Sequence, residues 1–277
     1  MKKFFAIAAI AAMTLSFMAC EPEEEQTPNP GPGTEQGGEN NGGNNNGGNN
    51  NGGENNGGDQ GETPAPAPVE FDCLKGSDYY LIFLDGTTYN SISSKVVADY
   101  RTDDYNSHLW IWENTYAAGT CTGPNSFGEI EGWISLNVTN VGWSGAGFCC
   151  YNAAALSKLA AVTASPADYV FHISMKSQDA ATHEIVLYSD GGGEAKAQLD
   201  VNGLYGFARD GEWYEIEIPM THFTNQGLLW TPNLGAGAVP GDNVATAPTG
   251  GHNVMAILSG ASGAVNLDAC FIYKPAK

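Results

Sequence analysis

Six tryptophans are the side chains in this 277-residue chain that are best suited to ligand chemistry. A flat aromatic ring stacks on the apolar C–H face of a sugar ring, while nearby polar groups bond the sugar hydroxyls. Trp112 and Trp230 are the leading candidates: Trp112 ends a strand-like stretch, and Trp230 lies in a loop-like stretch where we expect a ring exposed at a rim. Tyr116 and Asn114 follow Trp112 in the adjoining loop, and Trp213 is the third candidate ring.

The remaining tryptophans are Trp110, Trp133 and Trp143. Trp110 shares a strand face with Trp112 if residues 109–112 are extended. Trp133 and Trp143 lie in strand-like, glycine-rich surroundings, and we assign both to the core. For any single tryptophan here, packing in the core is the alternative to ligand binding.

Two glutamates offer the chemistry of an enzyme. Glu129 and Glu131 lie two residues apart and would share a strand face, which suits the acid/base pair of a glycoside hydrolase. The Glu-x-Asp-x-x-Glu arrangement of jelly-roll β-glucanases is absent, however, and a solvated strand face is the favoured interpretation. A polysaccharide lyase would need basic and Tyr or His groups, but the five histidines are scattered and arginine is scarce.

A β-rich domain must position these side chains. A series of stretches has the alternation and the β-branched or aromatic content of strands, separated by Gly, Asn, Asp, Ser and Pro clusters. They are residues 79–84, 95–100, 109–112, 132–138, 147–151, 169–175, 184–188, 196–201, 213–218, 254–258 and 265–273. Residues 153–161 have helical character, with Asn152 as the N-cap. The pattern predicts an all-β fold, an antiparallel jelly-roll β-sandwich with one short helix.

The clearest of these strands follows Asp210-Gly211, a dipeptide typical of a two-residue hairpin turn that needs φ > 0. From residue 213 to residue 218, apolar side chains alternate with Trp213, Glu215 and Glu217. The apolar face is predicted to pack in the core. The opposite face carries an aromatic ring among carboxylates and is a second candidate ligand surface.

Several of these stretches together show a family resemblance. The series Leu156-Ser157-Lys158-Leu159, Asp168–Lys176, Asp210–Met220 and Asn266–Tyr273 resembles the galactose-binding-like jelly rolls of carbohydrate-binding modules. Glycan-binding surface lipoproteins of gut Bacteroidetes carry such modules. The resemblance implies a noncatalytic glycan-binding role, often beside a polysaccharide uptake system.

The same resemblance implies a structural calcium ion. Jelly-roll binding modules often hold Ca²⁺ through carboxylates and backbone carbonyls where the first and last strands meet. Asp268 matches the acidic position of the family's last strand, and Glu70 or Asp72 would supply the partner. The alternative is that Asp268 caps or hydrogen-bonds locally.

The first 68 residues are predicted to deliver and tether the domain. Residues 1–19 combine a basic start, a short apolar run and a small residue before Cys20, which resembles the signal peptide of bacterial lipoproteins. The alternative is an ordinary signal peptide with an incidental cysteine. Residues 20–68 are the lipidated Cys20 and a disordered, acidic, Asn/Gly/Pro-rich tether. Residues 69–277 are the jelly-roll domain.

The acidic run at residues 21–25 resembles the surface-export signal of Bacteroidetes lipoproteins, although a solvated spacer is the alternative. We therefore expect an outer-membrane protein that is lipid-anchored, exposed at the cell surface, and in contact with the membrane through its lipid alone.

Five cysteines follow Cys20, and an odd number outside the cytoplasm leaves at least one free thiol or an unusual pairing. Cys73 and Cys270 lie near the two ends of the domain and could pair. Most of the cysteines fit small buried hydrophobic positions, and their spacing does not suggest a zinc site.

The net charge of −20 argues against nucleic acid and anionic lipid headgroups as partners. With only Arg101 and Arg209 in the chain, recognition of a polyanion through clustered arginines is disfavoured as well. The favoured hypothesis is a surface lipoprotein whose noncatalytic jelly-roll domain binds a neutral glycan. A glycoside hydrolase or polysaccharide lyase on the same scaffold is one alternative, and a structural or adhesive surface protein is the other.

Overall fold

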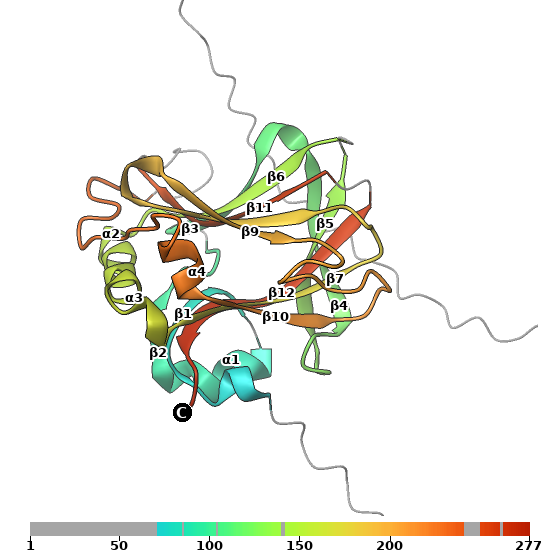
Figure 1. Cartoon of the computed structure of the whole chain (residues 1–277), viewed down its shortest axis with the longest axis horizontal. Coiled ribbons are helices and arrows are strands. Elements are labelled where there is room, and N and C mark those ends of the chain that lie inside the picture. The colour runs from blue at the N-terminus through green and yellow to red at the C-terminus, as the bar shows by residue number, and fades with distance from the viewer. Residues whose placement is uncertain (1–70, 85, 104, 140–141, 241–249, 261–262) are drawn as a thin grey trace, which may run out of the picture. The chain divides into compact units, whose positions relative to one another are not determined.

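Two β-sheets stacked face to face form the part of the chain that the computed structural model describes, residues 71–84, 86–103, 105–139, 142–240, 250–260 and 263–277 (Figure 1). The predicted signal peptide and tether lie outside these residues. The strands are β1 (Ser77–Phe83), β2 (Val96–Asp99), β3 (Ser107–Ile111), β4 (Tyr116–Pro124), β5 (Ile130–Val138), β6 (Ser144–Cys150), β7 (Val170–Ser177), β8 (His183–Tyr188), β9 (Glu194–Leu199), β10 (Tyr214–Pro219), β11 (His252–Ser259) and β12 (Ala264–Lys274).

The seven-stranded sheet has the order β10-β7-β12-β1-β2, with β5 paired to β12 and β4 paired to β5. The five-stranded sheet has the order β3-β6-β11-β8-β9. Neighbouring strands are antiparallel except β1 and β2, which are parallel. The predicted all-β jelly-roll β-sandwich is confirmed, because two mainly antiparallel sheets face each other across one core.

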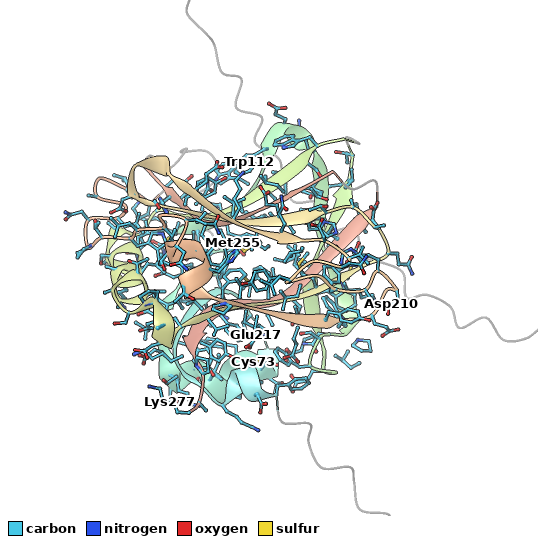
Figure 2. The ribbon with its side chains drawn as sticks, in the orientation of Figure 1. Cys73, Trp112, Asp210, Glu217, Met255 and Lys277 are labelled. Carbon is cyan, nitrogen blue, oxygen red and sulfur yellow. The ribbon has the colours of Figure 1, made fainter. Side chains whose placement is uncertain are left out.

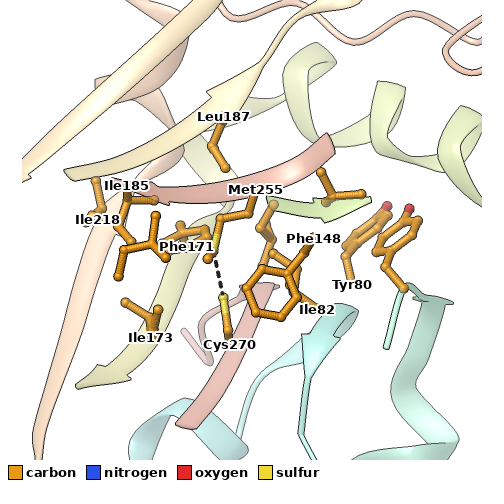
Figure 3. Close-up of a cluster of buried hydrophobic side chains, with 14 of the residues drawn as sticks. Tyr80, Ile82, Phe148, Phe171, Ile173, Ile185, Leu187, Ile218, Met255 and Cys270 are labelled. Carbon is orange, nitrogen blue, oxygen red and sulfur yellow. Dashed lines mark hydrogen bonds between the residues drawn. The ribbon is translucent and has the colours of Figure 1, made fainter. Parts of the chain in front are cut away.

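Alternating side chains of both sheets fill the main core between them. Ile173 of β7, Ile218 of β10 and Cys270 of β12 lie in one cluster with Ile185 and Leu187 of β8, all with no exposed surface (Figure 3). The alternation arises because successive side chains of a strand point to opposite faces of the sheet. In each strand, every second side chain therefore points into the core, and the side chains between them lie on the outer face of the sheet.

A second, smaller core covers part of the outer face of the seven-stranded sheet. It contains Cys73, Tyr79, Leu81, Leu84, Ile92, Phe127, Ala269, Phe271 and Tyr273. The helix α1 (Gly86–Ile92) and the short helix η1 (Asp72–Leu74) contribute to it, and Figure 1 shows α1 on the side of this sheet away from β11. Along β12, Cys270 and Ile272 face the main core while Phe271 and Tyr273 face the second one.

The predicted helix at residues 153–161 is confirmed as three consecutive turns, α2 (Ala153–Leu156), η4 (Ser157–Leu159) and α3 (Ala160–Ala164). Asn152 caps it as expected, since its side chain accepts a hydrogen bond from the Ala155 amide at 3.1 Å. The prediction of a single helix is wrong, because α1 and α4 (Met220–Thr224) also form. Among the described residues, no helix is long and apolar enough to cross a lipid bilayer.

Three further expectations need correction. Cys73 and Cys270 are both free, because they lie on opposite faces of the seven-stranded sheet. Gly211 has the expected positive φ of 89°, but the segment does not close a hairpin: β9 belongs to the five-stranded sheet and β10 to the other. The loop predicted around Tyr116 is the start of β4, which pairs with β5 along its whole length.

Candidate functional site

Trp112 lies on the outer face of the five-stranded sheet, directly after β3. Leu109 and Ile111 of β3 pack against the main core. The alternate residues His108, Trp110 and Trp112 therefore lie on the outer face of the sheet. The six-membered ring of the Trp112 indole spans two glycines of the neighbouring strand β6. A methyl group at Gly145 would lie 2.6 Å from Cε3 of Trp112, and one at Gly147 would lie 3.0 Å from Cζ2.

The turn after β3 fixes this ring to the sheet. The Thr115 hydroxyl donates to the Trp112 carbonyl at 2.8 Å and accepts from the Gly145 amide at 3.0 Å, and Thr115 is fully buried. Glu113 and Asn114 have φ values of 52° and 55°, a left-handed conformation that non-glycine residues seldom adopt. Such backbone strain persists only where the surrounding contacts determine it, which makes this turn a candidate functional feature.

Polar and aromatic neighbours surround the ring. The Asn253 amide oxygen lies 2.7 Å from the same hypothetical methyl position at Gly147, so Asn253 and Trp112 flank one glycine. The Trp110 indole N–H donates to the Tyr151 hydroxyl at 3.1 Å, and the His108 ring packs edge-on against both side chains. Burial, with a smaller contribution from Cys149, raises the pKa of Tyr151 to about 12, so its hydroxyl stays protonated.

Two predicted site residues are not available to a ligand. Trp230 is 1% exposed and donates its indole N–H to the Tyr188 carbonyl at 2.7 Å, so the expectation of a ring at an exposed rim is wrong. Tyr116 is 3% exposed and belongs to the main core. Asn114 does lie exposed beside Trp112. Its carbonyl accepts a hydrogen bond from the Thr139 hydroxyl.

Trp213 belongs to a different surface, on the outer face of the seven-stranded sheet. Its ring meets that of Trp133 edge-to-face, with 5.8 Å between centroids, and its indole N–H donates to the Pro124 carbonyl at 3.3 Å. The Lys176 ammonium lies about 6 Å from both rings, at 5.9 and 6.0 Å from their centroids. Trp112 and Trp213 therefore cannot contribute to one site, since the sandwich separates them.

The assignment of two tryptophans to the core is also wrong. Trp133 is half-buried on the outer face, where its indole donates to Asn266 at 3.2 Å. Trp143 is 41% exposed and directly precedes β6. Since one residue separates it from Gly145, an extended chain at this point would place Trp143 on the same side of the sheet as Gly145.

The residues predicted to bind calcium have other partners. Asp268 is buried, and its carboxylate accepts hydrogen bonds from the amide and hydroxyl of Ser126, at 3.0 and 2.7 Å, and from the Ala269 amide at 2.8 Å. Asp72 is exposed and pairs with Lys75 at 2.9 Å. Glu70 lies outside the described residues. The hydrogen bonds of Asp268 match the local alternative, and calcium stays a prediction.

Glu129 and Glu131 are half-buried and bind the start of α1. Glu131 accepts a hydrogen bond from the Thr87 amide in the first turn of α1, and Glu129 accepts one from the Thr88 hydroxyl at 3.3 Å. Burial and the neighbouring Glu131 carboxylate raise the pKa of Glu129. These contacts explain the pair as an attachment of α1 to the β4–β5 turn.

A pocket of about 360 Å³ lies apart from these aromatic surfaces, near the C-terminus. Its lining residues are Lys75, Gly76, Ser77, Asp168, Lys274, Pro275, Ala276 and Lys277. It has no aromatic side chain, and it is less suited to stacking on a sugar than the surface around Trp112.

No family model matches the chain, and no curated protein does either. Solved structures similar to it include the family 11 carbohydrate-binding module of the cellulosomal cellulase Lic26A-Cel5E of Clostridium thermocellum. The two are 14% identical, over 62% of this chain and 88% of that one, with a TM-score of 0.32. TmCBM61, solved in complex with beta-1,4-galactotriose, is 11% identical over 61% of this chain and 88% of that one, with a TM-score of 0.31.

A third similar structure is SGBP-B from a complex xyloglucan utilization locus in Bacteroides uniformis. It is 10% identical over 62% of this chain and 49% of that one, with a TM-score of 0.32.

Proposed function

We propose that this protein is a lipid-anchored surface protein that binds a neutral glycan, without catalysis, on the outer face of its five-stranded sheet. The observation that carries the proposal is the Trp112 ring, held across Gly145 and Gly147 beside the Asn253 amide. A fixed, half-buried indole with a polar neighbour provides both contacts that a sugar needs, a flat apolar surface and a hydrogen-bonding group.

The surrounding residues favour a neutral saccharide longer than one unit. His108 and Trp110 give further half-buried aromatic surface on the same side of the sheet, and Trp143 is exposed directly before β6. The net charge of −20 disfavours an acidic polysaccharide. Glu129 and Glu131, the carboxylate pair considered for catalysis, bind α1 on the outer side of the other sheet, which supports noncatalytic binding over the enzyme alternative.

The test is a screen of the full-length protein against an array of neutral glycans, followed by calorimetry on the best ligand. We expect Trp112→Ala to weaken binding about 30-fold, because a central aromatic anchor typically contributes about 2 kcal/mol. Trp213→Ala is the matched control on the other sheet and should leave the affinity unchanged. Equal binding by Trp112→Ala and the wild type would exclude this site, and no binding to any glycan would favour the adhesive alternative.

A parallel incubation with neutral polysaccharides checks the absence of catalysis. We expect no new reducing ends and no unsaturated products. Their appearance, above the level of a heat-denatured control, would favour a hydrolase or lyase instead.

A further inference from the structure

Three potential metal ligands from distant parts of the chain meet on the outer face of the seven-stranded sheet. Cys73 comes from η1, His172 from β7 and Glu215 from β10, and one ligand atom of each lies within 4.8 Å of the others. Cys73 is 1% exposed and His172 is fully buried, whereas Glu215 is exposed. Figure 2 shows Cys73 on the side of the sandwich opposite Trp112, so this group is separate from the proposed glycan surface.

The imidazole of His172 is already oriented. Its ring stacks on Phe271, with centroids 4.7 Å apart and planes 15° apart. Nδ1 lies 3.4 Å from Oε1 of Glu217, and the same oxygen accepts the Tyr273 hydroxyl at 2.6 Å. Metal-binding histidines commonly donate one ring N–H to a carboxylate, which fixes the tautomer and leaves the other nitrogen free to bind the ion.

The other nitrogen, Nε2, lies beside Ser174, the residue that pairs with Glu215 across the two strands. Nε2 of His172 lies 3.5 Å from the Ser174 hydroxyl. In the pairing of β7 with β10, Ser174 lies opposite Glu215 and His172 lies opposite Glu217. The two glutamates thus have different positions relative to the ring: Glu217 lies beside Nδ1, and Glu215 lies on the side of Nε2.

The charge of this region favours a cation. Glu215 lies within reach of both Cys73 and His172, Glu217 lies 3.4 Å from His172, and Asp72 precedes Cys73 in the chain, so three carboxylates gather around this group. Like charges that repel one another across a half-buried site are stabilised by a bound cation.

We propose that Cys73, His172 and Glu215 bind one Zn²⁺ ion, with His172 acting through Nε2 and water in the fourth position. A thiolate, an imidazole and a carboxylate suit zinc, whereas Ca²⁺ prefers oxygen ligands alone. Ligand atoms around tetrahedral zinc are about 3.3–3.8 Å apart, since the zinc–ligand distances are about 2.0–2.3 Å. The exposed Glu215 side chain can move by the required distance, because solvent leaves its rotamers free.

The ion would link η1 to β7 and β10. Its binding displaces the thiol proton of Cys73 to solvent as the zinc–sulfur bond forms, so the affinity rises with pH. Because the ion binds only where the three segments are assembled, it stabilises the folded protein.

The experiment uses the full-length protein, stripped with EDTA, dialysed, and titrated with ZnCl₂ by calorimetry. We expect one ion per chain, a higher melting temperature, and with CoCl₂ a thiolate-to-cobalt absorption band. Cys73→Ser should remove the band and weaken zinc binding at least 100-fold, and Glu215→Gln should weaken it about 10-fold. Glu212→Gln changes an exposed glutamate of the same segment and should bind zinc like the wild type.

Several outcomes would overturn the proposal. They are the absence of saturable zinc binding by the wild type, wild-type affinity in Glu215→Gln, and a cobalt band that persists in Cys73→Ser but disappears in Cys149→Ser. Glu215 is exposed, so Glu215→Gln tests the site even if Cys73→Ser does not fold. A preference for CaCl₂ over ZnCl₂ would also contradict the assignment, because sulfur is a poor ligand for calcium.

Discussion

At the scale of single residues, Gly145 and Gly147 matter because they leave room for the Trp112 ring. A side chain at either position would occupy the volume that the indole now fills, with methyl-to-ring distances of 2.6 and 3.0 Å. Contacts under 3.0 Å force the neighbour to move, and at Gly147 the Asn253 amide is the nearest atom, at 2.7 Å.

We predict that Gly147→Ala weakens glycan binding several-fold, because the new methyl displaces both the ring edge and the amide. Calorimetry with the ligand found on the array measures the effect, and thermal unfolding shows how much of it is loss of fold. Gly193→Ala is the matched control, since the nearest atom to its methyl would be 3.5 Å away. Wild-type affinity in Gly147→Ala would mean that the position of the Trp112 ring is unimportant.

His183 is a second residue whose environment determines a measurable property. It is fully buried, and its Nδ1 lies 2.9 Å from the Ser259 hydroxyl. Burial, and then the nearby Arg209 charge, lower its pKa to about 4, although Asp179 acts in the opposite direction. The unfolded chain, with an ordinary histidine pKa near 6.5, therefore binds a proton that the folded protein does not.

We predict that the free energy of unfolding falls as the pH drops from about 6.5 to about 4, by about 3 kcal/mol from this group. Above about pH 6.5 this contribution of His183 to the free energy of unfolding no longer changes, because the imidazole is then neutral in both the folded and the unfolded state. Denaturant unfolding of the wild type and of His183→Asn at several pH values tests this. The variant should be less stable near neutral pH and show a shallower dependence, and identical slopes would refute the assignment.

At the scale of elements, Asp268 joins β12 to the turn between β4 and β5. The ladder between β12 and β7 has a bulge after Asp268, where Ala269 has a φ of 49°. A bulge redirects a side chain and bends its strand. Here Asp268 comes to accept three hydrogen bonds, two of them from Ser126 in the distant turn.

We predict that Asp268→Ala lowers the free energy of unfolding by about 2–3 kcal/mol, because the half-buried Ser126 donors and the buried Ala269 amide lose their acceptor. Ser126→Ala, which removes one of the bonds, should lower it by about 1 kcal/mol. Denaturant unfolding gives both values. If EGTA destabilises the wild type as much as Asp268→Ala does, and leaves that variant unchanged, the carboxylate binds calcium instead.

At the scale of the whole molecule, the two outer faces of the sandwich have different proposed roles. The Trp112 surface belongs to the five-stranded sheet, and the Cys73–His172–Glu215 group belongs to the seven-stranded sheet. Because distant sites without shared partners act independently, zinc should change thermal stability without changing glycan affinity.

The proposed attachment of the molecule rests on Cys20 and is tested separately. We predict that the wild type incorporates an alkyne-labelled fatty acid in bacterial cells and fractionates with membranes. Cys20→Ser should lose the label and leave the membrane fraction, since no acyl chain can then be added. Surface proteolysis of intact cells checks exposure, and labelling of Cys20→Ser would contradict the lipid site.

Local patterns in the sequence determined much of this protein. Alternation predicted most strands, Asn152 was recognisable as a helix cap, and Trp112 could be selected because it ends an alternating stretch. The weak helix formers of α1, among them Gly86, Thr87 and Thr88, gave no such signal. The strands and the Asn152 cap depend on neighbours a few residues away, which is why the sequence alone reveals them.

Only the tertiary structure decided which surfaces meet. Period-two alternation shows that a strand has two faces but not what covers each one, so Trp230 was expected at the surface and lies in the core. For the same reason the pairing of Cys73 with Cys270 was wrong. The grouping of Cys73 with His172 and Glu215 depends on the packing of η1 against β7 and β10, a contact between segments far apart in the chain that no local spacing encodes.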